Sequence, residues 1–105
     1  MPRRTCFINA NRGRNIHRLM EMGFAFEEQR SSFYMRGEMR KRRKKYVVEL
    51  FFRDGFVIVS DSTQDAKDPN FLAEVCRTWS DVLDSLVRRR ALTEKQRLAY
   101  EDRKP

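Results

Sequence analysis

The chain has 105 residues, of which 40% are hydrophobic and 36% charged, and its formal net charge is +8. A chain of this length builds one domain around one core, which excludes a multidomain enzyme or a receptor with a separate sensor. It has neither a run of about 18 apolar residues nor an apolar leader after Met1, so we expect a soluble, cytoplasmic protein with no membrane partner.

Metal-binding and redox residues are scarce. Cys6, Cys76 and His17 are too few for a disulfide framework or for an ordinary four-ligand zinc site. We expect Cys76 to be a small buried hydrophobe and His17, which lies between two arginines, to be a neutral surface residue. No metal and no cofactor is expected.

The first predicted elements are short. Residues 5–8 are interpreted as a strand or an ordered arm. Residues 12–22 are predicted to form a helix, because their apolar residues recur at helical spacing. Asn11 or Asn15 is its candidate N-cap, and Gly23 stands where a left-handed residue ends a helix.

Antiparallel strands are predicted after this helix, at residues 24–30, 33–38, 46–53 and 56–61. The first two are indicated by alternation of apolar and polar residues. The last two are separated by Asp54 and Gly55, a pair that is typical of a two-residue type I′ hairpin turn. This turn would place Arg53 opposite Phe56.

The alternation in this hairpin predicts two different faces. One is entirely apolar and is expected to face the core: Val48, Leu50, Phe52, Val57 and Val59. The other is mixed: Val47, Glu49, Phe51, Arg53, Phe56 and Ile58. On it, Phe51 and Phe56 are candidates for stacking with single-stranded bases. The favoured interpretation is instead a buried face, covered by the N-terminal arm, by the short helix or by a second subunit, and the last of these would make a homodimer.

A long helix is predicted at residues 69–90, with Asp68 as N-cap and Pro69 at its first position. Its apolar residues form one stripe, and Trp79 in the centre is expected to anchor the core. Residues 88–90 are arginines that complement the helix dipole.

A weak tail helix is predicted at residues 94–102, because Thr93 and Gln96 resemble a capping box. The elements together predict an α+β fold of two layers. In it, an antiparallel sheet of three to four strands packs on the long C-terminal helix, with a short N-terminal helix.

This order of elements resembles the double-stranded-RNA-binding domain in topology. In that family a lysine-rich start of the second helix contacts phosphates. The corresponding positions here are Asp68, Pro69 and Asn70. The resemblance therefore transfers no binding residues.

The positive charge is concentrated in the first part of the chain. Residues 1–45 hold 13 Lys and Arg against 4 Asp and Glu, and residues 46–105 hold 10 against 11. The main contribution is a basic run of six consecutive cations: Arg40, Lys41, Arg42, Arg43, Lys44 and Lys45. Because adjacent like charges resist burial, we expect this run to project from the tip of a hairpin toward a polyanion.

We therefore predict a small non-enzymatic protein that contacts the phosphates of DNA or RNA through the basic run, with Arg12, Arg14 and Arg18 as a second contact. A competing class is a protein-interaction module or inhibitor, of the kind that small viral and mobile-element proteins often are. It would dock onto an acidic or nucleic-acid-handling protein. A solvated loop or an import signal is the remaining interpretation of the run.

Catalysis has little support in the sequence. A metal-dependent nuclease needs converging acids, and the candidates are Glu49, Asp61, Asp65 and Asp68. The predicted register places Glu49 opposite Ser60, next to Asp61. Asp68 already serves as a cap, and the chain has no glycine-rich phosphate loop and no nucleophile elbow. We expect no enzymatic activity.

Overall fold

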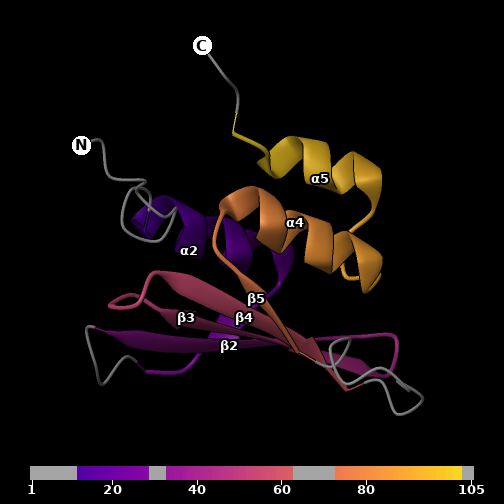
Figure 1. The fold of residues 1–105 in the computed structure, drawn as a ribbon. Helices are drawn as coiled ribbons and strands as arrows, with labels where there is room; N and C mark the ends of the chain where they lie inside the picture. Colours follow the sequence, from indigo (N-terminus) through magenta and orange to yellow (C-terminus); the bar gives the residue numbers. More distant parts are fainter. Residues whose placement is uncertain (1–11, 29–32, 63–72, 103–105) are drawn as a thin grey trace.

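A computed structural model describes residues 12–28, 33–62 and 73–102 of the chain. Within these ranges, helices α2 and α4 lie on one face of a five-stranded sheet, and α5 lies over α4 on the same side (Figure 1). The strand order is β1-β2-β3-β4-β5, and each neighbouring pair is antiparallel. The predicted α+β class with one antiparallel sheet is confirmed, but the sheet has five strands rather than three or four.

The described elements are α2 (Arg12–Met22), β1 (Ala25–Phe26), β2 (Tyr34–Lys41), β3 (Lys44–Phe51), β4 (Phe56–Asp61), β5 (Ala73–Cys76), α4 (Trp79–Arg88) and α5 (Glu94–Tyr100). The bounds of α2 and β4 coincide with the predicted ones, whereas β2 and β3 extend into the basic run and β3 ends at Phe51. The strand predicted at 24–30 is too long, because its described residues form only the two-residue strand β1. The predicted arm at 5–8 and the caps at Asn11 and Asp68 lie outside the described residues.

Helix α2 ends at Gly23 as predicted. Gly23 has a φ of +121°, its N–H donates to the Met20 carbonyl at 3.0 Å, and the next N–H, from Phe24, donates to the Leu19 carbonyl at 3.0 Å. These two bonds satisfy carbonyls that the helix end would otherwise leave unpaired. Asn15 is not the N-cap, because it is fully buried within the helix.

The β3–β4 hairpin has the predicted faces but a different register. Phe51 lies opposite Phe56, so that residues 52–55 form a loop in place of the predicted two-residue turn. Gly55 still supplies a positive φ, of 78°, and its N–H donates to the Phe51 carbonyl at 2.8 Å. The register differs by two residues, which preserves side-chain alternation, and all five residues predicted to face the core are buried.

The observed register also determines the position of Asp61. The predicted register would place this carboxylate opposite Val48, within the apolar part of the sheet. In the structure Asp61 lies opposite Tyr46, where it binds the buried Arg89. The observed strand register therefore gives the buried Arg89 a carboxylate partner. The residues of the turn alone do not predict this register.

The long helix predicted at 69–90 is wrong over residues 73–78, and its residues 69–72 lie outside the described ranges. Residues Ala73–Cys76 form the edge strand β5, and α4 begins only at Trp79. The side chain of Thr78 caps α4 by accepting a hydrogen bond from the Asp81 N–H at 3.1 Å. The added strand also departs from the topology of the double-stranded-RNA-binding domain.

The reason for this error lies in the side chains of β5. Glu74 is directed to the inner face, where its carboxylate binds Arg89, whereas Val75 on the outer face is 58% exposed. A strand with a charged inner residue and an apolar outer residue does not show the usual alternation. The apolar residues of this segment also fit a helical period, which is why the sequence pattern predicted a helix there.

The core lies between the sheet and the helices. Trp79 is 3% exposed, as predicted for a core anchor, and its indole N–H donates to the Tyr100 carbonyl at 2.7 Å, which holds α5 against α4. Cys76 is buried as predicted, although on a strand, and burial raises the pKa of its thiol to about 12. None of the helices in the described ranges is long and apolar enough to span a bilayer.

The tail helix α5 begins with the predicted capping box. The Thr93 hydroxyl accepts from the Gln96 N–H at 3.1 Å, and the Gln96 side chain accepts from the Thr93 N–H at 2.9 Å. The two bonds satisfy two of the donors that open a helix.

Candidate nucleic-acid interface

The basic run forms the tip of the β2–β3 hairpin, at the right of the view in Figure 1. Because β2 continues through Lys41 and β3 begins at Lys44, only Arg42 and Arg43 make the turn. Their φ angles are 53° and 67°, the signs that a type I′ turn requires. This turn type, expected at Asp54 and Gly55, therefore occurs at two arginines.

These backbone angles are unfavourable for arginine. A residue with a Cβ loses roughly 1 kcal/mol in the left-handed region, which is why Asn and Gly dominate such turns. Two consecutive arginines thus occupy positions that Asn or Gly would adopt with less backbone strain. Strain of this kind is concentrated at sites of function.

The three lysines of the run bind their own chain. Lys41 Nζ donates to the Ala91 carbonyl at 3.2 Å, and Lys44 Nζ donates to the Arg89 carbonyl at 3.4 Å. Lys45 Nζ lies 2.6 Å from a carboxylate oxygen of Glu38. Lys41 and Lys44 therefore serve the carbonyl end of α4, where the helix dipole favours cations.

The three arginines of the run differ from the lysines. Arg40, Arg42 and Arg43 are exposed. Over the ranges 12–28, 33–62 and 73–102, their side chains make no ion pair or hydrogen bond. They are the most exposed positive charges of the basic run.

The hairpin is fixed to α4 through Arg89, whose side chain is fully buried. Its guanidinium donates to Asp61 Oδ2 at 2.8 Å, to Glu74 Oε1 at 3.0 Å and to Ser85 Oγ at 3.1 Å. Its carbonyl accepts from the Tyr46 hydroxyl at 2.7 Å. A buried charge is stable only with such partners, so the end of α4 is held against β3, β4 and β5.

The electrostatics of Glu74 reflect this network. Burial would raise the pKa of its carboxyl, but hydrogen bonds from Ser85 and Arg89 and the charge of Arg88 outweigh burial and lower it. Glu74 therefore stays ionised and holds two arginines of α4 and its cap, Arg88 and Arg89.

Arg90 is a further exposed cation at this end of the domain, and it was not among the site residues predicted from the sequence. It follows the cap of α4 with a φ of 66° and donates its N–H to the Val87 carbonyl at 3.0 Å. Glycine usually occupies this left-handed position. Residues 88–90 were expected to act together on the helix dipole, but their environments differ. Arg88 pairs with Glu74, Arg89 is buried and Arg90 is exposed.

Arg90 belongs to the same charged end as the hairpin turn. Burial and the charge of Asp61 raise the pKa of the Tyr46 phenol, while Arg42, Arg89 and Arg90 all oppose this rise. The hydrogen bonds agree with this placement, because the carbonyls on either side of Arg90, those of Arg89 and Ala91, bind the two lysines that flank the turn. The non-glycine residues with positive φ in the described ranges are Arg42, Arg43 and Arg90.

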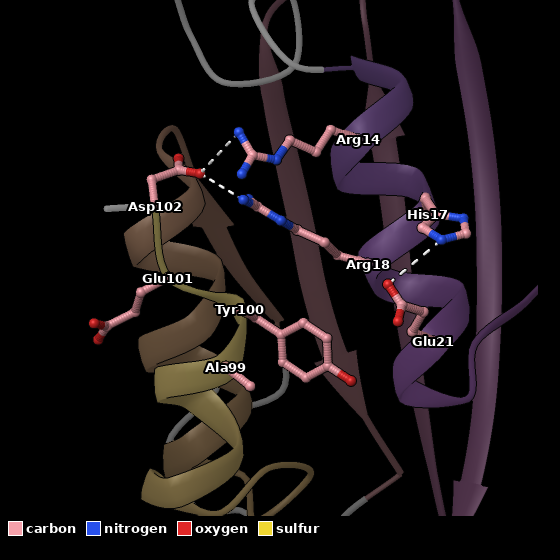
Figure 2. A pocket seen from close by; sticks show the side chains of 8 residues that line it. All are labelled: Arg14, His17, Arg18, Glu21, Ala99, Tyr100, Glu101 and Asp102. Atoms are coloured by element: carbon pink, nitrogen blue, oxygen red, sulfur yellow. Dashed lines mark hydrogen bonds and ion pairs between the residues drawn. The ribbon is translucent and has the colours of Figure 1, made fainter. Parts of the chain in front are cut away.

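The predicted second contact does not extend this surface. Arg18 is only 7% exposed, and its guanidinium donates to Asn15 Oδ1 at 2.9 Å and to Asp102 Oδ1 at 2.6 Å (Figure 2). Arg14 lies 4.0 Å from the same carboxylate oxygen. Arg18 is therefore a structural residue that joins α2 to the segment after α5.

Arg12 lies at the far end of the sheet from the basic turn. Its guanidinium carbon is 3.8 Å from the centre of the Phe52 ring, in the β3–β4 loop. Strands of eight residues separate this loop from the β2–β3 turn by about 25 Å. The two groups of cations cannot form one small contact.

An open groove of about 740 Å³ lies between α2 and the C-terminal end of α5. Figure 2 shows Arg14 and Arg18 directed to Asp102, with His17 beside Glu21. His17 is exposed on the surface as predicted, 3.5 Å from the Glu21 carboxylate. In this groove Arg14 and Arg18 face the carboxylate of Asp102, which compensates part of their charge.

The outer face of the sheet carries the predicted stacking candidates. The rings of Phe51 and Phe56 are stacked with centroids 5.0 Å apart, and the Tyr34 ring lies 5.1 Å from Phe51. Burial and then a 2.7 Å hydrogen bond to Glu49 raise the pKa of the Tyr34 phenol to about 12. Helix α2, one of the expected covers, lies on the opposite face (Figure 1).

The acidic residues considered for catalysis do not converge. Glu49 lies opposite Ile58 on the outer face, and Asp61 is opposite Tyr46 on the inner face. Among the described residues there is no group of three or more His, Cys, Asp or Glu side chains suited to a metal. Asp65 and Asp68 lie outside these residues.

Comparison of the chain with protein-family models, curated proteins and solved structures finds no match. Function is therefore inferred from side-chain placement and charge. The missed residue, Arg90, had one signal in the sequence: the apolar pattern of α4 ends at Val87 without a glycine, so that another residue must take the left-handed position.

Proposed function

We propose that the protein is a non-enzymatic nucleic-acid-binding protein that contacts phosphates with an arginine tip, formed by Arg40, Arg42, Arg43 and Arg90. The observation that carries this proposal is the exposure of Arg42 and Arg43, without acidic partners in the described chain, on strained turn positions. Arginine suits this role because its planar fork binds phosphate oxygens in pairs.

The surrounding structure supports the proposal because it makes the tip rigid. Lys41 and Lys44 bind backbone carbonyls at the end of α4, and Tyr46 binds the Arg89 carbonyl. The arginines are therefore presented by a hairpin anchored on three side chains. Cations held in place lose less conformational entropy when they bind a polyanion.

Binding at such a tip would be governed by phosphates. Each neutralised phosphate contributes about 0.9 to the salt slope of the affinity on duplex DNA and about 0.7 on a single strand. Phosphate contacts position a protein without reading sequence, so the affinity would be weakly selective among sequences.

The test uses two matched triple variants that each remove three positive charges. R40Q/R42Q/R43Q removes the exposed arginines, and K41Q/K44Q/K45Q removes the lysines that bind the chain. Oligonucleotide affinity is measured by fluorescence anisotropy from about 50 to about 200 mM salt. We expect the arginine variant to lower the slope on duplex DNA by about 2.7 and the lysine variant to change it much less.

Three outcomes would contradict the proposal. The arginine variant could bind as tightly as the parent, the two triple variants could lose the same slope, or the parent could bind no oligonucleotide. In the last case, co-purification with a stable acidic protein would favour the competing class, a protein-interaction module or inhibitor. A cooperative thermal unfolding transition is required of each variant, to establish that it is folded.

A further inference from the structure

Three aromatic rings form a row across the outer face of the sheet. Tyr34 lies opposite Phe51, and Phe51 lies opposite Phe56, so that β2, β3 and β4 contribute one ring each. All three side chains are partly exposed. The row therefore presents a continuous aromatic surface at the end of the sheet near the β3–β4 loop.

Cations border this row at the same end of the sheet. The Arg77 guanidinium lies 5.8 Å from the centre of the Phe56 ring, and the Arg53 guanidinium lies 5.7 Å from the centre of the Phe33 ring. Arg53 and Arg77 are exposed, and Phe33 is 56% exposed. Aromatic rings beside arginines are the combination that binds bases and the phosphates between them.

The acids of this face are occupied by their neighbours. Glu49 accepts the hydrogen bond of the Tyr34 hydroxyl, and Glu38 pairs with Arg36 and Lys45. Cations compensate the charge of Glu38, whereas Glu49 keeps its charge because the Tyr34 hydroxyl that binds it is neutral. Arg53 and Arg77 remain as exposed charges beside the rings, which favours an anionic occupant.

We propose that the outer face of the sheet binds single-stranded nucleic acid, with bases stacked on Tyr34, Phe51 and Phe56 and phosphates at Arg53 and Arg77. This inference rests on the proposed function and adds the form of nucleic acid that is bound. Paired bases inside a duplex offer no free ring face, so only a single strand can use the row. A second copy of the chain is a poorer occupant, because it would bring another net charge of +8 against this surface.

The test compares Phe51→Leu with the parent protein, because leucine keeps apolar volume and removes the ring. The probes are labelled oligothymidylate of about 12 nucleotides and a duplex of equal length, measured by anisotropy at one salt concentration. We expect the variant to lose single-strand affinity by roughly 5- to 150-fold while duplex affinity stays unchanged. Phe51→Tyr should restore binding, and Leu98→Ala, at an exposed apolar residue on α5, is the matched control.

Ultraviolet crosslinking of the parent to the same oligothymidylate gives an independent readout. The crosslinked peptides should contain Tyr34, Phe51 or Phe56. If Phe51→Leu is unfolded by circular dichroism, Phe56→Leu replaces it.

The results separate this inference from the proposed function. If Phe51→Leu binds the single strand like the parent while R40Q/R42Q/R43Q loses affinity, the stacking row is wrong and the arginine tip stands. If the parent sediments as a dimer that Phe51→Leu dissociates, a second copy covers the face and the inference is overturned. If the parent binds neither probe, the proposed function fails as well.

Discussion

Replacing Arg42 with Asn and Arg43 with Gly is expected to stabilise the fold and to weaken binding at the same time. The φ angles of 53° and 67° cost a residue with a Cβ roughly 1 kcal/mol each. Asparagine tolerates these angles better and glycine adopts them freely, but glycine also loses about 0.5 to 1 kcal/mol of chain entropy on folding. The net gain is therefore about 1 kcal/mol, or roughly 4 to 8 °C in Tm.

Unfolding by urea and by heat, followed through the fluorescence of the buried Trp79, measures the stability. R42K/R43K keeps both charges and both strained angles, so it should match the parent in stability. R42Q/R43Q removes the charges but keeps the strain. On duplex DNA, both R42N/R43G and R42Q/R43Q should lower the salt slope by about 1.8. An unfolding midpoint for R42N/R43G below that of R42Q/R43Q would refute this account of the turn.

Three further predictions concern stability. Arg89→Met removes the buried guanidinium from Asp61 and should cost about 3 to 5 kcal/mol of unfolding free energy, whereas R89M/D61N should recover part of this loss in the same urea titration. Trp79→Phe removes the hydrogen bond to the Tyr100 carbonyl and should cost about 1 kcal/mol of unfolding free energy. Relative to the parent, hydrogen exchange should accelerate more in α5 than in α4. The unfolding free energy should fall from pH 9.0 toward about pH 12, because Cys76 ionises near 9.0 when unfolded but near 12 when folded. Cys76→Ala should flatten that decline, and an unchanged pH profile would contradict the burial of the thiol.

The sequence pattern predicted which side chains of the sheet face the core more reliably than it predicted the pairing register of the strands. In the β3–β4 hairpin, Leu50 and Val57 lie on the predicted core face although the turn was placed wrongly. A shift of two residues keeps every side chain on its face, so periodicity alone cannot detect it. The position of Asp61 depends on Arg89, which is 28 residues away in the chain.

The missed strand β5 has a similar cause. Glu74 is on the inner face because Arg89 and Ser85 bind it there, so the strand lacks an apolar inner face at that residue. One local signal was present, since Thr78 and Asp81 have the spacing of a capping box and mark the start of α4. The partners of Glu74 come from α4, which follows β5 in the chain.

The basic run could be located from the sequence, but its exposed arginines could not be distinguished from the lysines that bind the chain. Six adjacent cations look alike in a sequence, and the difference between Lys41 and Arg42 comes from the carbonyl of Ala91, which lies 50 residues beyond Lys41. Arg90 joins the arginine tip for the same reason. Long-range packing, rather than local composition, thus determines which charges remain available.

The most direct measurement of the arginine tip is a nuclear magnetic resonance titration that observes the arginine Nε–H signals while a short oligonucleotide is added. The account predicts shifts for Arg40, Arg42, Arg43 and Arg90, with the buried Arg89 unchanged. Binding that leaves these four signals in place, or an absence of binding at low salt, would contradict it.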